Sequence, residues 1–122
     1  MYQVDIWLHA SPSNYWAQLE FTDKDGKRRE KIVSRERIAT INSNTIQGMI
    51  EAVRVLQIPC MLDIHTESEY VIGIIRNGWL WNWKKNGWRK ANGKEIRNVE
   101  QWQQLEQELA RHSIKISKME GA

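Results

Sequence analysis

The stretch that decides the fold runs from Thr66 to Arg89 and reads TESEYVIGIIRNGWLWNWKKNGWR. It continues an apolar run, Met61 to Thr66, which is short enough to predict a buried strand. A helix is expected from Ser68, because apolar side chains then recur at three- and four-residue spacing. Trp79 to Trp88 predicts a further helix and turn, rich in tryptophan and lysine and ended by Gly87.

Three strands are predicted before this stretch. Tyr2 to Leu8 and Tyr15 to Phe21 both alternate between apolar and polar residues, as half-buried strands do. The link from Ser11 to Asn14 is short and rich in turn-forming residues, which favours an antiparallel hairpin. A second turn, Asp23 to Gly26, leads into a third strand from Arg29 to Ser34.

Helices and strands then alternate toward the C-terminus. A helix is predicted from Asn44 to Gln57, with polar capping side chains at its start and Pro59 beyond its end. Val99 to Arg111 predicts a last helix, and Ser113 to Lys118 a closing strand. The strand, helix, strand order requires parallel pairing. The sequence therefore predicts an α/β fold in one domain over residues 1–122, with a mixed five-stranded sheet whose first three strands are antiparallel.

Composition favours a cytoplasmic protein with one packed core. The apolar fraction of 41% is enough for such a core without disulfides. The one cysteine, Cys60, falls in an apolar run, where a buried, inert thiol is expected and a reducing compartment is favoured. Residues 1–10 lack the basic start and continuous apolar stretch of a signal peptide. No apolar run approaches the ~18 residues that span a bilayer, so no membrane contact is expected.

Positive charge is concentrated in one segment. The net charge is only +3, but residues 76–97 hold seven lysines and arginines and a single acidic residue, Glu95. Because protein surfaces ordinarily mix both signs, this segment predicts contact with a polyanion. The charges of the last helix are expected to be ordinary exposed ones; they are Glu100, Glu106, Glu108 and Arg111.

Three strings in this order have counterparts in one known family. They are TESEYV from Thr66, WLWNWKKNGWR from Trp79 and NVEQWQQL from Asn98. The chain resembles bacterial type 1 ribonuclease H, in which such strings form a strand end, a basic protrusion and the start of a helix. Weaker similarity in the first hairpin and in the helix at Asn44 extends the resemblance over nearly the whole chain. The resemblance implies a ribonuclease H-like fold.

The resemblance also implies where a catalytic site would lie. The family hydrolyses phosphodiesters with two Mg²⁺ ions held by four carboxylates. Carried over by position, the first-strand aspartate falls on His9, the helix glutamate on Gln47 and the strand-end aspartate on Glu67. The fourth carboxylate belongs to a C-terminal helix for which residues 1–122 hold no counterpart.

Four carboxylates thus become one, Glu67. Mg²⁺ requires anionic oxygen ligands, and the imidazole of His9 suits Zn²⁺ better. We therefore expect no catalytic residues, no bound metal, no cofactor and no enzymatic activity. A substitute metal site of His9, Glu67 and Glu51 is the less favoured interpretation, because each residue is also an ordinary polar group at a strand or helix end.

The basic protrusion is the part of the family's machinery that this chain keeps. It resembles the element that grips the DNA strand of an RNA–DNA hybrid, whereas the family's glycine-rich first turn is absent from Ser11 to Asn14. Cations there would neutralise phosphates, and tryptophans would pack on sugar or base. The expected nucleic-acid-binding residues are Trp81, Lys84, Lys85, Trp88, Arg89, Lys90 and Lys94. Trp79, Trp83 and Trp102 are expected instead to anchor helices to one another.

Three functions remain open from the sequence. The first is an inactive ribonuclease H-like protein that binds an RNA–DNA hybrid or duplex through the protrusion. The second is a protein-binding inhibitor or adaptor of a nucleic-acid enzyme such as an RNA-guided nuclease. The third is an active Mg²⁺- or Mn²⁺-dependent ribonuclease H with an altered site at Glu67. The sequence fixes neither the oligomeric state nor any sequence preference.

Overall fold

The computed structural model describes residues 1–119, which form five strands and four helices. In chain order these are β1 (Tyr2–Ser11), β2 (Asn14–Thr22), β3 (Arg28–Glu36), α1 (Ile41–Arg54), β4 (Cys60–Thr66), α2 (Glu69–Arg76), α3 (Trp79–Lys85), α4 (Val99–Leu109) and β5 (Ser113–Lys118). Within this part of the chain, no helix is both long enough and apolar enough to cross a membrane.

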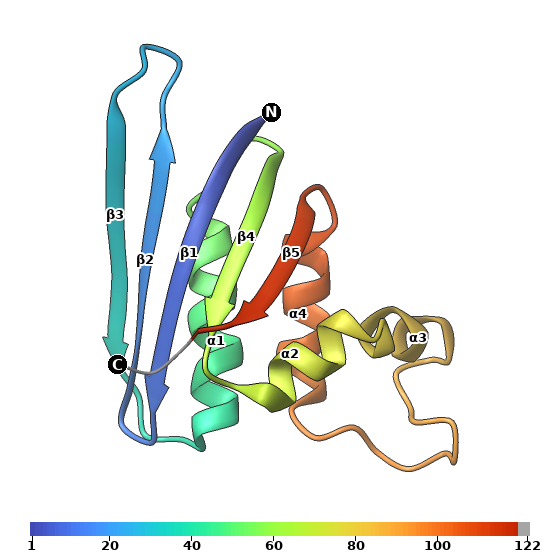
Figure 1. Cartoon of the computed structure of the whole chain (residues 1–122). Helices are drawn as coiled ribbons and strands as arrows, with labels where there is room; N and C mark the ends of the chain where they lie inside the picture. The colour runs from blue at the N-terminus through green and yellow to red at the C-terminus, as the bar shows by residue number, and fades with distance from the viewer. Residues whose placement is uncertain (120–122) are drawn as a thin grey trace.

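The five strands form one mixed sheet in the order β3-β2-β1-β4-β5 (Figure 1). β1, β2 and β3 pair antiparallel, and β4 pairs in parallel with both β1 and β5. This arrangement confirms the predicted fold class, a mixed five-stranded sheet whose first three strands are antiparallel. β1 and β4 can pair in parallel because α1 carries the chain from the end of β3 back to the end of the sheet where β1 starts, and β4 starts there too.

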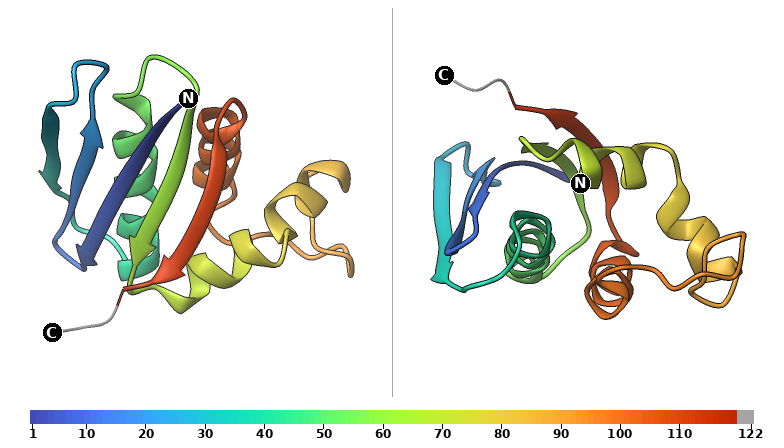
Figure 2. Two further views of the ribbon diagram at one scale, coloured as in Figure 1. Left: turned by 45° about the horizontal axis from the view of Figure 1, so that its top comes forward. Right: turned by 90° about the horizontal axis from the view of Figure 1, so that it is seen from below.

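The hydrophobic core lies between the sheet and the helices α1 and α4, which cover the same face (Figures 1 and 2). Alternation along the strands sends apolar side chains to this face. The buried strand residues there are Val4, Ile6, Leu8, Ala17, Leu19, Leu62, Ile64 and Ile116. The opposite face carries mostly polar and aromatic side chains, and the described part of the chain places no helix over its middle.

Helix α1 starts three residues earlier than the sequence predicts and ends three residues earlier too. Thr40 caps it, because its hydroxyl accepts the Ser43 backbone N–H at 3.0 Å. Asn44, the predicted start, is buried, and its amide donates to the backbone carbonyls of Ser11 and Arg37 at 2.7 and 2.8 Å. Asn44 therefore does not cap the helix; it connects α1 to the end of β1 and to the residue that follows β3.

Two further expectations about side chains have different outcomes. Cys60 is buried as predicted, and burial raises the pKa of its thiol. Glu106, predicted to be an ordinary exposed charge, is only 6% exposed, and its carboxylate accepts the Lys84 ammonium at 2.7 Å. The prediction for Glu106 is wrong because its partner lies on another helix, 22 residues away.

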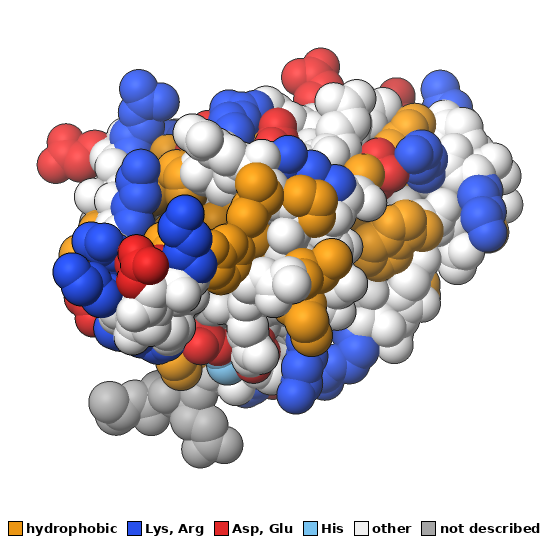
Figure 3. Space-filling model, turned by 90° about the horizontal axis from the view of Figure 1, so that it is seen from above, with side chains coloured by type: hydrophobic (Ala, Val, Ile, Leu, Met, Phe, Trp, Pro, Cys, Tyr) orange, Lys and Arg blue, Asp and Glu red, His pale blue; other side chains and the backbone are white. Residues whose placement is uncertain are grey.

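The end of the molecule where β1 begins carries a hydrophobic surface, with lysine and arginine side chains around it (Figure 3). A largely apolar cavity of about 290 Å³ opens near there, between the sheet and the end of α1. Tyr2, Phe21 and Leu56 are among the side chains that line it.

Trp102 should be a main source of stability. Its ring is fully buried and contacts the rings of Trp83 and Tyr70 edge-on, with centroids 6.0 and 6.1 Å apart. Trp102→Ala should lower the free energy of unfolding by about 3–5 kcal/mol. The matched control is Trp79→Ala, which should change it by less than ~0.5 kcal/mol, because Trp79 is 51% exposed. Urea unfolding measures both; equal losses would contradict the packing described.

Acidification should destabilise the fold through His112. Its Nδ1 accepts the Cys60 backbone N–H at 3.0 Å, and a proton on that nitrogen breaks this bond. Burial, with help from the Arg111 charge, lowers the pKa of His112. The unfolded chain therefore takes up the proton first, so the stabilisation is complete above the unfolded pKa of about 6.5 and is lost as the pH falls toward the folded value.

The measurement is urea unfolding across this pH range for the wild type and for His112→Asn, whose amide oxygen can accept the same bond. The free energy of unfolding should fall less steeply in the variant. Identical slopes would show that His112 does not contribute.

Candidate functional site

The carboxyl ends of β1 and β4 lie side by side, because the parallel register places Leu8 beside Thr66. His9 and Glu67 follow directly, and the structure brings these two predicted site positions together. His9 Nδ1 lies 3.3 Å from Glu67 Oε1. The two side chains are 48% and 58% exposed, so this ion pair contributes little to stability.

An open cavity of about 270 Å³ adjoins Glu67 at these strand ends. Strand residues of β1 and β4 and the first turns of α1 and α2 line it; they are Leu8, Ala10, Ile41, Asn42, Thr45, Thr66, Glu67, Ser68, Glu69 and Tyr70. Ser68 caps α2 by accepting the Val71 backbone N–H at 3.2 Å. The cavity therefore lies where two helices begin and two parallel strands end.

Like His9, Gln47 does not line this cavity. Its amide donates to Glu51 at 3.0 Å and accepts from Gln101 of α4 at 3.1 Å, so it joins the two helices. Three α1 residues line the cavity, namely Ile41, Asn42 and Thr45. The bonds to Glu51 and Gln101 account for the different place of Gln47, because they direct its amide toward α4.

The side chains at the strand ends do not fit a pair of Mg²⁺ ions. Glu67 is the one carboxylate there without a lysine partner in the described structure, since Glu69 accepts the Lys118 ammonium at 2.7 Å. His9 offers nitrogen and Thr45 a hydroxyl that already donates to the Ile41 carbonyl at 2.8 Å. Two Mg²⁺ ions need several anionic oxygens, so no metal-dependent step is derived for this site.

Glu51 does not complete a substitute site either. It accepts from Gln47 and from Arg54, at 3.0 and 3.1 Å. Over residues 1–119, the histidine and carboxylate groups close enough to share a metal do not include His9, Glu51 and Glu67 together.

The basic protrusion, defined here as residues 79–97, extends away from the sheet (Figures 1 and 2). It consists of α3 and the loop that leads to α4. Two left-handed positions, Gly87 and Trp88, turn the chain after α3, and Gly93 (φ 80°) turns the loop back. Arg89 and Glu95 then form an isolated antiparallel bridge, and Ile96 is buried in the core. The loop is therefore attached at both ends.

The expected phosphate-binding cations of the protrusion are all exposed. Lys85, Arg89, Lys90 and Lys94 make no ion pair within the part of the chain that the structure describes. Lys84 differs, because Glu106 partly neutralises it. Four of the five expected phosphate-binding cations are therefore exposed and unpaired in the described part of the chain.

The burial of three tryptophans of the protrusion differs from what their predicted roles imply. Trp81 and Trp88, expected to contact nucleic acid, are partly buried against the core, as is Trp83. Trp79, expected to anchor helices, is 51% exposed. The prediction for Trp102 is confirmed, since that ring is fully buried.

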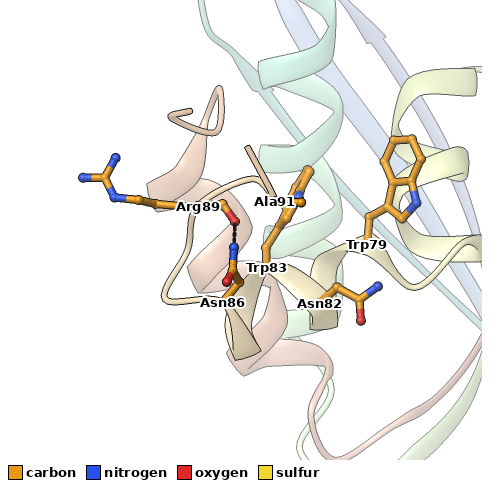
Figure 4. A pocket seen from close by; sticks show the side chains of 6 residues that line it. All are labelled: Trp79, Asn82, Trp83, Asn86, Arg89 and Ala91. Carbon is orange, nitrogen blue, oxygen red and sulfur yellow. Dashed lines mark hydrogen bonds between the residues drawn. The ribbon is translucent and has the colours of Figure 1, made fainter. Parts of the chain in front are cut away.

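A cavity of about 540 Å³ lies between α3 and the loop (Figure 4). Its lining residues are Trp79, Asn82, Trp83, Asn86, Arg89 and Ala91. The Asn86 amide donates to the carbonyls of Arg89 and Lys90 at 3.0 and 3.2 Å, which holds the loop against the helix. The Arg89 guanidinium points away from the cavity (Figure 4).

Among these lining residues the sequence predicted only Arg89 as a binding residue; besides Trp83 and Ala91, sequence reasoning missed Trp79, Asn82 and Asn86. With Trp83 they recur at positions i, i+3, i+4 and i+7, which is one face of a helix. The helical spacing could therefore have identified the lining, although not the loop that closes it.

Comparisons with known proteins agree with this architecture. The family model of RNase H matches residues 10–121. A ribonuclease H of Bordetella pertussis is 39% identical over 117 residues, which cover 92% of this chain and 73% of that protein. A ribonuclease H of Clostridium botulinum is 35% identical over 96 residues, 79% of this chain and 64% of that protein. The chain thus matches less than two thirds of the length of the latter relative.

Solved structures share the fold at low sequence identity. LC9-RNase H1, a type 1 RNase H with the type 2 active-site motif, matches with a TM-score of 0.83 at 19% identity, over 99% of this chain and 64% of that one. The foamy viral protease-reverse transcriptase in complex with an RNA/DNA hybrid matches with a TM-score of 0.69 at 16% identity, over 96% of this chain and 17% of that one.

Sheet order, strand-end site and basic protrusion define a ribonuclease H-like α/β protein. By the extent of the family match and the identity to its relatives, the chain belongs to the ribonuclease H family.

Restoring carboxylates should show which α1 residue faces the site. The double change His9→Asp and Glu67→Asp should bind Mg²⁺ more tightly when combined with Thr45→Glu than when combined with Gln47→Glu, because Thr45 lines the cavity and Gln47 does not. Ligand binding stabilises the native state by an amount that grows with the logarithm of the ratio of free ligand to Kd, so at one Mg²⁺ concentration the tighter binder shows the larger shift in melting temperature. A larger shift for the Gln47→Glu variant would contradict the observed helix phase.

Proposed function

We propose that this chain binds nucleic acid, as RNA–DNA hybrid or duplex, through the basic protrusion and does not hydrolyse RNA. One observation carries the proposal: Lys85, Arg89, Lys90 and Lys94 of the protrusion stand exposed without acidic partners in residues 1–119, next to a cavity lined by tryptophan and asparagine. Residues 76–97 hold seven lysines and arginines against one acidic residue, whereas the seven in residues 24–37 are interspersed with three acidic residues.

Phosphate is the group that such a surface would bind. Each lysine or arginine that neutralises a phosphate releases condensed counterions, which makes binding favourable at low salt. Trp79 is exposed at the mouth of the cavity, where an aromatic ring can stack on a base or pack against a sugar. The Asn82 amide adds a donor for phosphate or sugar oxygens.

The side chains at the strand ends support the proposal that this chain does not hydrolyse RNA. It offers one available carboxylate and an imidazole where the two-metal reaction needs several carboxylates. The relatives are named ribonuclease H, and a protein of this fold is solved with an RNA/DNA hybrid, which supports a hybrid as the bound molecule. The free, buried thiol of Cys60 supports a reducing compartment, and we propose the cytoplasm.

Salt dependence tests the binding surface. The affinity for an RNA–DNA hybrid should fall linearly with salt on logarithmic axes. Replacing both Lys85 and Lys90 by alanine should weaken binding and lower the slope by about 2, since each phosphate contact contributes about 1. Fluorescence anisotropy at several salt concentrations gives both quantities.

A matched control replaces two exposed lysines at the far end of the sheet. Lys24→Ala with Lys27→Ala removes the same charge from the turn between β2 and β3 and should leave the slope within about 0.5 of the wild type. Equal effects of the two pairs would show that net charge, rather than the protrusion, attracts the nucleic acid.

The same hybrid, incubated with Mg²⁺ or Mn²⁺, tests the absence of hydrolysis. No cleavage above buffer is expected. Cleavage that disappears in Glu67→Ala would overturn this part of the proposal and leave the binding surface in place.

A further inference from the structure

A cluster of three metal-ligating side chains lies on the uncovered face of the sheet, apart from the strand ends. Asp5 comes from β1, and Asp63 and His65 come from β4. One ligand atom from each lies within 4.8 Å of the others. Asp5 precedes His9 by four residues on the same face, which places the cluster about 13 Å along the strand from the His9 and Glu67 pair.

The distances within the cluster are too long for hydrogen bonds. His65 Nε2 lies 3.6 Å from Asp5 Oδ1 and 3.6 Å from Asp63 Oδ1. They are close to the separation of ligands around one Zn²⁺ ion: bonds of about 2.0–2.1 Å in a tetrahedron put neighbouring ligand atoms roughly 3.3–3.4 Å apart.

Two of the three ligand atoms are buried without any hydrogen-bond partner. Asp63 Oδ1 and His65 Nε2 are both shielded from solvent in this way. Buried polar atoms ordinarily have a partner, because leaving one unpaired costs about 1–3 kcal/mol. The side chains keep 29%, 23% and 17% exposure at Asp5, Asp63 and His65, so an ion can still reach them.

The imidazole is held in the orientation that a ligand needs. Trp7 stacks on His65 with ring centroids 4.0 Å apart and planes 12° from parallel. Ser117 of β5 lies 3.3 Å from the other ring nitrogen, Nδ1. Metal-bound histidines typically have such a partner on the second nitrogen, which fixes the ring and leaves Nε2 free.

The charge pattern of the sheet leaves the two carboxylates without a cation. The parallel register sets Asp5 directly beside Asp63, an arrangement that repulsion makes unfavourable. Lys115 is the β5 neighbour of Asp63 in the register, yet no ion pair joins them. Along residues 1–119, His65 Nε2 is the one basic nitrogen within 4.0 Å of either aspartate carboxylate.

We propose that Asp5, Asp63 and His65 form a binding site for a borderline divalent cation, with Zn²⁺ as its best representative. Two carboxylates and one imidazole leave a fourth position for water or for a group from a partner, as in zinc sites with three protein ligands. The imidazole favours Zn²⁺ over Mg²⁺. This inference does not depend on nucleic-acid binding or on the state of the strand-end site.

Isothermal titration of the whole chain with Zn²⁺ tests the proposal, with Co²⁺ absorption as a second measurement. The wild type should bind one Zn²⁺, and Co²⁺ should give visible bands of a low-coordinate ion. Asp63→Asn keeps the shape of the side chain but removes the charge, and should weaken binding by more than the roughly 10–100-fold typical of an outer-shell change. Ser117→Ala should weaken it by an amount within that range.

His9→Ala is the matched control, because it removes the other exposed imidazole of this sheet face and should leave the Zn²⁺ affinity unchanged. Loss of binding in His9→Ala, with retention in Asp63→Asn, would place the ion at the strand ends and overturn the proposal. Failure of the wild-type chain to bind Zn²⁺ would overturn it as well. Far-ultraviolet circular dichroism of each variant confirms that the fold is kept.

Discussion

The parallel pairing of β1 with β4 is the constraint on which the rest of the structure depends. The register from Tyr2 beside Cys60 to Leu8 beside Thr66 sets which side chains meet across the two strands. It places Ile6 beside Ile64 in the core, and it brings His9 and Glu67 together at the strand ends. A slip of one residue would turn every side chain of one strand to the wrong face. The apolar residues that alternate along both strands therefore specify the polar sites indirectly.

The protrusion depends on a second interaction, the burial of Trp102 in α4. Trp83 of α3 contacts this ring, and Lys84 of the same helix reaches Glu106 one turn farther along α4. A short helix such as α3 has little stability by itself, so these contacts hold it against the body. The cations that follow, from Lys85 onward, can then stand in solvent on a fixed support.

The sequence predicts much of the fold because periodicity reports burial directly. The strand bounds of β5 agree with the prediction, and each of the other strands is longer than predicted by one to three residues. The start of α1 could not be predicted in the same way. Thr40 and Asn44 are both good caps, and only the bonds from Asn44 to Ser11 and Arg37 decide between them.

The sites differ in how far sequence alone could reveal them. The exposed cations of the protrusion are close together in the chain, so the sequence shows the cluster directly as a run of lysines and arginines. The Asp5, Asp63 and His65 cluster joins residues about 60 positions apart through one register, which no local pattern reports. The architecture also separates the two surfaces, since the protrusion packs on α4 and the cluster lies on the face of the sheet that α4 does not cover. Cation binding on one surface and phosphate binding on the other therefore share no side chain, and each can be removed by substitution while the other is kept.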